Sequence, residues 1–295
     1  MQEDLFVAGH TACAGCGQSL AARIVLNAAG RDTIITNATG CLEVFSTGFP
    51  QTAWRVPFIH SLFENASAVA SGIEVGLKAL GIKDGVNVIS QGGDGGTADI
   101  GLQSLSGMLE RGHDILYVMY DNEAYMNTGI QRSGMTPAYA NTTTSPPGKL
   151  SLGNPQPKKN MAAICAAHDI PYSTTASVGY PRDIERKVKK AISIKGPKFL
   201  HIFVPCPLGW RHDPSATEKI AKLAVETGLF PVVEYESGNI SKVMQFKELK
   251  PVNEFLKTQG RFKHLMKDSP EIKEAIEFLN KIVQENVKRY SLIKQ

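Results

Sequence analysis

Residues 86–129 read VNVISQGGDGGTADIGLQSLSGMLERGHDILYVMYDNEAYMNTG, and they decide the fold class. The segment begins with an apolar run at 86–89, turns at a glycine cluster at 92–96, and continues with apolar residues at helical spacing. A second apolar run at 115–120 ends in the polar sequence 121–129. This order of strand, turn, helix and strand predicts a βαβ unit with two parallel strands.

The glycine turn and the polar loop should meet in space, because parallel strands deliver their carboxyl ends to one edge of a sheet. Glycines let backbone N–H groups approach an anion, and a helix N-terminus stands behind them. Asp94 would repel a phosphate unless a cation such as Mg²⁺ lay between them, and Asn122 can add a carbonyl oxygen. An ordinary tight turn is the alternative, but the pair of features resembles the diphosphate motif of thiamine-diphosphate enzymes.

Length and composition set the broad class. A chain of 295 residues can form one large domain with an appendage, and 42% hydrophobic with 20% charged residues is typical of a globular protein. A net charge of +4 without a long Lys/Arg block argues against nucleic-acid binding. No apolar run approaches the roughly 18 residues of a membrane span, and the acidic N-terminus lacks the layout of a signal peptide. We expect a cytoplasmic protein without a membrane span.

Strand and helix patterns alternate along residues 1–210, which predicts an α/β domain with a mostly parallel sheet and helices on both faces. Residues 211–295 have a different sequence pattern, in which helical segments recur. We predict that they form a helix-rich C-terminal arm that packs on this domain or on a partner. Further strands are expected at 33–37, 172–178, 198–204 and 231–235, and helices at 20–28, 65–80, 161–168, 181–194, 215–227 and 269–293.

The segment 127–160 shows no apolar period and is rich in Thr, Pro and Gly. A structureless loop of this length inside a domain tends to be functional, and a disordered surface insertion is the alternative. Lys158 and Lys159 close the loop, and we interpret them as a solvated pair rather than a phosphate clamp.

Five cysteines in an intracellular chain indicate ligands rather than disulfides. Cys13 and Cys16 form a Cys-x-x-Cys pair, whereas Cys41 and Cys206 each follow an expected strand and should face the edge that carries the glycine turn. Structural zinc more often uses two compact Cys-x-x-Cys pairs, so the spacing favours a [4Fe–4S] cluster, with zinc or no metal as alternatives. Cys165 has a helical, alanine-rich setting and is predicted to be inert packing.

Seven segments together resemble the β subunits of the 2-oxoacid:ferredoxin oxidoreductases, most closely those that act on pyruvate. The resemblance covers nearly the whole chain and is specific for the family, but less so for the substrate. The segments are CAGCG at 13–17, ATGCLEV at 38–44, LFEN at 62–65, GDG at 93–95, DNEAYMNTG at 121–129, PCP at 205–207 and QGRF at 259–262.

The resemblance implies three cofactors: thiamine diphosphate, Mg²⁺ and a [4Fe–4S] cluster. It assigns Mg²⁺ to Asp94, Asn122 and the backbone carbonyl of Ala124. The implied cluster ligands are Cys13, Cys16, Cys41 and Cys206. The residues implied at thiamine diphosphate are Gln18, Cys41, Gly93, Asp94, Gly95, Gly96, Asn122, Ala124, Tyr125, Met126 and Asn127.

Two of these positions carry more than cofactor contact. Asn127 is implied to face the substrate as well, and we assign it as a catalytic residue on that basis. Gln18 stands where family members have Glu, so the position keeps its hydrogen bonding but loses a charge.

The implied reaction is the coenzyme A-dependent oxidative decarboxylation of pyruvate to acetyl-CoA and CO₂, or its reverse, with electrons passing to ferredoxin. In such enzymes a second thiamine-type domain carries the Glu that protonates the aminopyrimidine ring. We expect a partner chain to supply it, in a complex with α, γ and δ subunits. The alternatives are the same chemistry on 2-oxoglutarate, a branched-chain oxoacid or oxalate, and a non-catalytic metal-binding scaffold.

Overall fold

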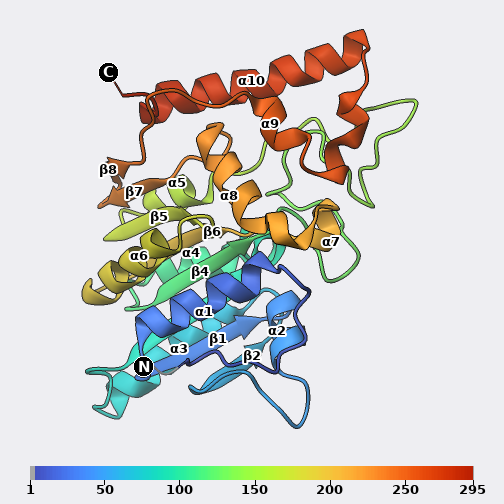
Figure 1. Cartoon of the computed structure of the whole chain (residues 1–295). Helices are drawn as coiled ribbons and strands as arrows, with labels where there is room; N and C mark the ends of the chain where they lie inside the picture. Colours follow the sequence, from blue (N-terminus) through green and yellow to red (C-terminus); the bar gives the residue numbers. More distant parts are fainter. Residues whose placement is uncertain (1–3, 295) are drawn as a thin grey trace.

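The computed structural model describes residues 4–294, and within them the strands form one eight-stranded sheet (Figure 1). The strand order is β2-β1-β3-β4-β6-β5-β7-β8. The first six strands in this order run parallel to their neighbours, and β7 and β8 are antiparallel. The strands are β1 (Thr33–Ala38), β2 (Phe58–Ser61), β3 (Asn87–Gly93), β4 (Leu116–Asp121), β5 (Tyr172–Ser177), β6 (Lys198–Phe203), β7 (Val233–Glu236) and β8 (Asn239–Val243).

Helices cover both faces of the sheet, as the α/β prediction requires. Helices α1 and α6 pack on one face, and α3, α4 and α5 pack on the other. The helices are α1 (Gly17–Ala29), α2 (Cys41–Ser46), α3 (Ala66–Ala79), a π-helical turn η1 (Gly96–Ile100), α4 (Leu102–Glu110), α5 (Met161–Ala166), α6 (Pro181–Ser193), α7 (Pro207–Trp210), η2 (Pro214–Ala216), α8 (Thr217–Glu226), α9 (Val252–Leu256), η3 (Gly260–Met266) and α10 (Pro270–Tyr290).

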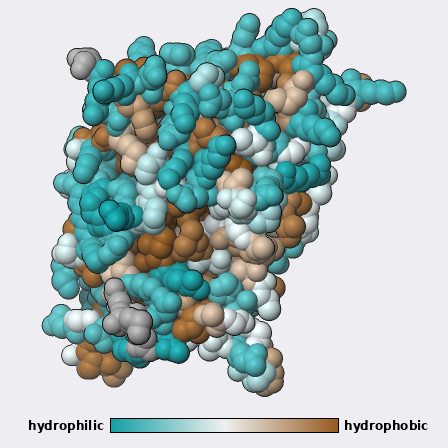
Figure 2. Space-filling model, in the orientation of Figure 1, coloured by the Kyte–Doolittle hydropathy of each residue, from teal (hydrophilic) through white to brown (hydrophobic). Residues whose placement is uncertain are grey.

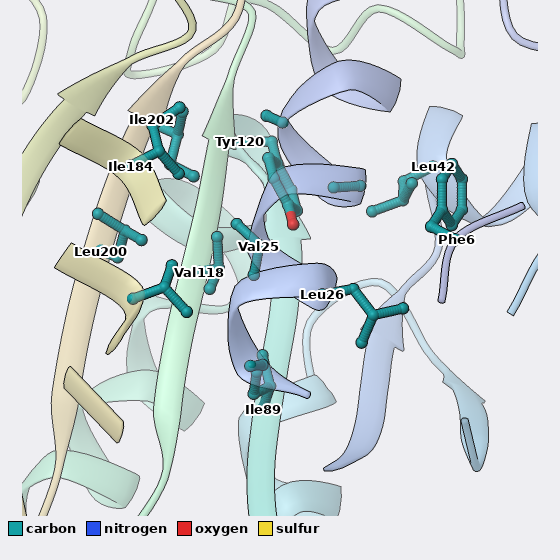
Figure 3. Packing of buried hydrophobic residues seen from close by; sticks show 14 of the residues in the cluster. Phe6, Val25, Leu26, Leu42, Ile89, Val118, Tyr120, Ile184, Leu200 and Ile202 are labelled. Carbon is teal, nitrogen blue, oxygen red and sulfur yellow. The ribbon is translucent and has the colours of Figure 1, made fainter. Parts of the chain in front are cut away.

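The continuous apolar run of β4 is explained by burial on both faces. Val118 and Tyr120 point into the core beneath α1, where Figure 3 shows them beside Val25. Tyr117 and Met119 alternate with them and join the core on the opposite face. A strand in the middle of a parallel sheet has no solvated side, so both sets of alternating positions must be apolar.

The register of the sheet brings the predicted motifs to one edge. β3 and β4 pair so that Gly93 lies opposite Tyr120, and the residues that follow, Asp94 and Asp121, leave the sheet side by side. β1 pairs with β2 on one side and with β3 on the other, so the chain reverses its winding between β1 and β3. Ligands of open α/β sheets bind in the crevice at such a reversal.

The C-terminal segment forms a second apolar core with the end of β6. Phe255, Leu279 and Val283 belong to one buried cluster with Phe203 and Trp210. β7 and β8 extend the same sheet, whereas α8, α9 and α10 contribute side chains to this core and are seen in the upper part of Figure 1. In the orientation of Figure 1, the surface of the molecule is largely hydrophilic, and hydrophobic residues gather near its middle (Figure 2). The division of the chain at residue 211 stays a prediction.

The structure adds short elements that periodicity did not predict. β2, β8, α2, α7 and α9 have four to six residues each, which is too short for an apolar period to develop. Between β4 and α5 the described chain has no helix or strand, as predicted. Met135, Ala138 and Ala140 in this segment are buried, so the alternative of a disordered surface insertion is wrong. Within residues 4–294 no helix is both long and apolar enough to cross a bilayer.

Candidate active site

The glycines after β3 allow two other segments to pack closely against this turn. A Cβ added to Gly95 would lie 2.4 Å from the Tyr125 ring, and one added to Gly96 would lie 3.1 Å from the carbonyl oxygen of Phe63. The chain turns directly from β3 into the π-helical turn η1, a geometry that is frequent at functional sites. The glycine cluster therefore serves close approach as well as backbone freedom.

Asp94 is the buried acid of this turn. Its Oδ2 accepts a 2.5 Å hydrogen bond from Ser133 Oγ, which belongs to the long loop after β4. Burial raises the pKa of the Asp94 carboxyl well above its ordinary value, and the neighbouring Asp121 raises it further. Since a buried carboxylate is costly without a compensating charge, the site is suited to a cation.

The amide of Asn122 stands against two other oxygen-bearing groups. One atom of the amide lies 2.9 Å from the carbonyl oxygen of Ala124 and 3.1 Å from Asp94 Oδ1. When the amide nitrogen takes this place, it donates to both oxygens. When the amide oxygen takes it, three oxygens converge, which is the arrangement that binds Mg²⁺. The donor set of one carboxylate, one amide and one backbone carbonyl fits Mg²⁺.

A cleft at this edge collects the residues assigned to thiamine diphosphate. Gln18, Cys41, Gly93, Asp94, Gly95, Gly96, Asn122, Ala124, Tyr125, Met126 and Asn127 all line it. Thr39, Gly40, Phe63 and Thr128 line it as well, although none of them was predicted as a site residue. They lie within the quoted segments 38–44, 62–65 and 121–129, and membership of those segments was the signal that could have found them.

The segments that carry Cys16 and Cys206 are packed together. Gly17 donates a 3.3 Å hydrogen bond to the carbonyl oxygen of Pro205, and a Cβ at Gly17 would lie 2.9 Å from that oxygen. Cys16 precedes α1 and Cys206 precedes α7, where its Sγ accepts from the Gly209 N–H at 3.4 Å.

The thiols of Cys13, Cys16 and Cys206 are near enough to Cys41 to affect its ionisation. Burial raises the pKa of Cys41 to about 12, and the neighbouring thiols of Cys206, Cys16 and Cys13 contribute to the rise. A hydrogen bond with the Asn127 side chain opposes this rise. Burial likewise raises the pKa of Cys206 to about 11, helped by Cys16 and Cys13.

Thiols with raised pKa values gain most from a metal, because coordination replaces the proton and neutralises the buried charge. The chemistry of the four-cysteine set therefore fits an iron–sulfur cluster. Across residues 4–294, however, no three His, Cys, Asp or Glu side chains form a group already placed around one metal ion. Cys165 lies apart on α5, fully buried in a separate core cluster, as predicted.

Residues 38–202 match the family model described as thiamine pyrophosphate enzyme, C-terminal TPP binding domain. The chain is 55% identical to pyruvate synthase subunit PorB of Methanocaldococcus jannaschii, over 99% of this chain and 98% of the relative. It is 57% identical to the subunit of the same name from Methanosarcina barkeri, over 96% of each chain. The chain belongs to the PorB family. Membership in the PorB family extends over the whole fold, including the C-terminal segment outside the matched domain.

Two proteins that are not named PorB are also similar to this chain. The chain is 53% identical to ketoisovalerate oxidoreductase subunit VorB of Pyrococcus abyssi, over 92% of this chain and 89% of the relative. It also resembles the solved structure of 2-oxoglutarate:ferredoxin oxidoreductase from Magnetococcus marinus, with a TM-score of 0.59 and 22% identity over 74% of this chain and 79% of that chain. At that identity the likeness shows a shared fold.

In this member of the PorB family, Lys158 is a partly buried counter-ion, so the expectation of a solvated lysine is wrong for this residue. Its Nζ lies 2.7 Å from Asp121 Oδ2 and 2.6 Å from Glu123 Oε1. Burial lowers the pKa of Lys158, but the two carboxylates raise it by more, and the ammonium stays charged. Lys159 is exposed, as expected, and pairs with Asp99 at 2.7 Å. Two adjacent lysines carry no sequence signal that tells which of them will be partly buried.

Proposed function

We propose that the chain is the thiamine-binding β subunit of a pyruvate:ferredoxin oxidoreductase. The reaction is the coenzyme A-dependent oxidative decarboxylation of pyruvate to acetyl-CoA and CO₂, or its reverse. The observation that carries the proposal is the convergence of Asp94, Asn122 and the Ala124 carbonyl in a cleft that Gln18 and Cys41 also line. It joins a metal–diphosphate site to a cysteine site at one edge of the sheet.

Thiamine diphosphate, when bound, supplies the nucleophile for the 2-oxo carbonyl and the electron sink for decarboxylation. The chain's own residues hold and orient it. Asp94, Asn122 and the Ala124 carbonyl would bind Mg²⁺ against the diphosphate. The backbone at Gly95 and Gly96 would face the phosphate oxygens. Asn127 lines the cleft and hydrogen-bonds to Cys41, so it would face the substrate between the two cofactors.

For the cysteine site we propose a [4Fe–4S] cluster held by Cys13, Cys16, Cys41 and Cys206. Such a cluster takes up electrons one at a time, which suits onward transfer to ferredoxin. The support is the thiol chemistry of the four side chains and the effect of the neighbouring thiols on the ionisation of Cys41 and Cys206. Zinc, the alternative from spacing, would not transfer electrons.

Replacing Cys13, Cys16, Cys41 or Cys206 singly by serine should remove most of the iron bound by this chain, because each substitution deletes one thiolate ligand. Iron and acid-labile sulfide per chain, together with absorbance near 400 nm, measure the loss. Cys165→Ser is the matched control, since Cys165 is a fully buried cysteine away from the site, and it should keep its iron. Full iron retention in Cys206→Ser would contradict the assignment of four cysteine ligands.

The proposed partners are the α, γ and δ subunits of one complex, with pyruvate, coenzyme A and ferredoxin as reactants, and we place the complex in the cytoplasm. Relatives named as subunits of pyruvate synthase support a multi-subunit assembly.

A branched-chain 2-oxoacid is the second candidate substrate, because the relative named as a ketoisovalerate oxidoreductase subunit is as similar as several pyruvate synthase subunits. The assembled complex should reduce a low-potential acceptor with a kcat/KM for pyruvate at least tenfold above that for 2-oxoisovalerate. The two differ by two methyl groups on the carbon next to the carbonyl, and a pocket closed to them discriminates by steric exclusion. A reversed ratio would assign the branched-chain substrate, and 2-oxoglutarate and oxalate complete the panel.

A further inference from the structure

A buried group of charged side chains lies directly behind the proposed metal-binding loop. Glu123 stands between Asn122 and Ala124 and has a backbone φ of 65°, a left-handed conformation that side-chain-bearing residues rarely adopt. Its side chain does not line the cofactor cleft and points into the protein interior, where it is 4% exposed. This turn at Glu123 leaves the groups on either side of it, the Asn122 amide and the Ala124 carbonyl, 2.9 Å apart.

Every polar group of Glu123 has a partner in the structure. Oε2 lies 2.6 Å from Arg261 Nη2, and Oε1 lies 2.6 Å from Lys158 Nζ. The carbonyl oxygen accepts a 2.7 Å hydrogen bond from Thr136 Oγ1, and the N–H donates to Asp121 Oδ1 at 3.0 Å. Residues held in a rare backbone conformation persist when their surroundings fix them in this way.

Arg261 contacts this loop in two ways from a segment that is distant in sequence: directly through Glu123, and indirectly through Trp210. It lies in η3, is 3% exposed, and is itself held by Gln259, whose Oε1 accepts from Arg261 Nε at 2.8 Å. The guanidinium stacks 3.7 Å from the centre of the Trp210 ring. Trp210 Nε1 in turn donates a 2.8 Å hydrogen bond to the carbonyl oxygen of Asn122.

Charge balance makes Arg261 more than a packing group. Asp94, Asp121 and Glu123 are all buried at this edge, and Lys158 is shared between Asp121 and Glu123. His201 Nε2 lies 2.7 Å from Asp121 Oδ2. Glu123 is paired with Lys158 and Arg261. Without Arg261, Lys158 alone would face two carboxylates, and Glu123 would lose the partner that draws it away from the cleft.

We propose that Arg261 is a positioning residue for the metal site, acting through Glu123 and Trp210 to hold Asn122 and Ala124 toward Asp94. The inference rests on the proposed function, because it concerns the loop assigned to Mg²⁺ and thiamine diphosphate. It gives the QGRF segment at 259–262 a role in cofactor binding, although that segment does not line the cofactor cleft. Partners that orient metal ligands typically change metal affinity by about 10- to 100-fold.

The test is Arg261→Met in the assembled complex. Methionine keeps an apolar side chain against Trp210 and removes the charge. Thiamine diphosphate affinity, measured by calorimetry at limiting Mg²⁺, should fall at least tenfold. Because the defect lies in the metal ligands, saturating Mg²⁺ should restore most of the affinity through linkage. Arg261→Lys keeps the charge without the planar stacking group. Its thiamine diphosphate affinity at limiting Mg²⁺ should lie between those of the wild type and Arg261→Met.

Lys198→Met is the matched control for a lost buried ion pair. Lys198 Nζ lies 2.6 Å from Asp114 Oδ1 at the opposite end of the sheet, and its side chain is 4% exposed. This variant should lower the melting temperature of the cofactor-free complex and leave cofactor affinity at every Mg²⁺ concentration within twofold of the wild type. Arg261→Met should differ from it in both respects: a loss of affinity, and a loss that depends on Mg²⁺.

An Arg261→Met complex with unchanged affinity, or with a loss that is equal at all Mg²⁺ concentrations, would overturn the positioning role. If Arg261→Met does not assemble, Glu123→Gln decides by the same criteria, because it keeps the side-chain shape and removes the charge that Arg261 holds. A wild-type complex that does not bind thiamine diphosphate with Mg²⁺ would instead overturn the proposed function.

Discussion

Asp94→Ala should weaken the binding of thiamine diphosphate at least tenfold, about 1.4 kcal/mol. Asp94 is the one charged group among the proposed Mg²⁺ ligands, and it lies fully buried at the mouth of the glycine turn. Without it the cation keeps only the Asn122 amide and the Ala124 carbonyl, and the diphosphate faces backbone dipoles alone. Calorimetric titration of the assembled complex with the cofactor, in the presence of Mg²⁺, measures the change.

The melting temperature of the cofactor-free protein distinguishes a loss of cofactor binding from simple unfolding. In the cofactor-free protein Asp94 is a desolvated carboxyl group next to Asp121, so its removal should not lower the melting temperature. The expected pattern is weaker cofactor binding at unchanged or higher stability, as is common where a site is strained for function. Asp94→Asn keeps the hydrogen-bond partner of Ser133 and isolates the contribution of the charge. An Asp94→Ala complex that binds the cofactor as tightly as the wild type would refute the role.

The central part of the site could be predicted from sequence because it depends on local order along the chain. An apolar run, a glycine turn and a second apolar run define two adjacent parallel strands, and the register then places Asp94 beside Asn122 without further information. The cysteine positions followed from the same reasoning, because Cys41 and Cys206 each come directly after a strand.

The supporting contacts could not be predicted, because they join segments that are far apart in sequence. Arg261 and Glu123 are separated by 138 positions, and the Trp210 indole bonds to Asn122 across 88. No periodicity connects such residues, and pairing of buried charges is decided by the final packing of the C-terminal segment. The same applies to Lys158, which looks in sequence like any surface lysine.

The isolated chain should be unable to turn over pyruvate, and bound thiamine diphosphate should exchange its C2 proton no faster than the free cofactor. Activation of the cofactor ring needs an acid beside the aminopyrimidine. Among the residues of 4–294 that line the cleft, Asp94 is the only acidic side chain, and its proposed role is to bind the metal. A carboxylate held against Mg²⁺ is in the wrong place and the wrong protonation state to serve the ring.

Glu123 and Glu64, two other acids within the quoted segments, are poor substitutes for different reasons. Glu123 is held by Arg261 and Lys158 on the far side of the loop. Glu64 precedes α3 and does not line the cleft. Glu64→Gln in the assembled complex should therefore leave C2 exchange unchanged, which directly tests whether Glu64 activates the cofactor ring.

The decisive comparison is C2 proton exchange followed by NMR, with Mg²⁺ and thiamine diphosphate, on the purified chain and on the chain joined to its complementary thiamine-type domain. Exchange should be slow in the first and fast in the second, with pyruvate turnover appearing at the same step, because the partner brings the acid to a cofactor already positioned by Asp94 and Asn122. Rapid exchange by the purified chain would mean that one of its own carboxylates activates the ring. The active site would then belong to this chain alone, and the shared-site interpretation would have to be abandoned.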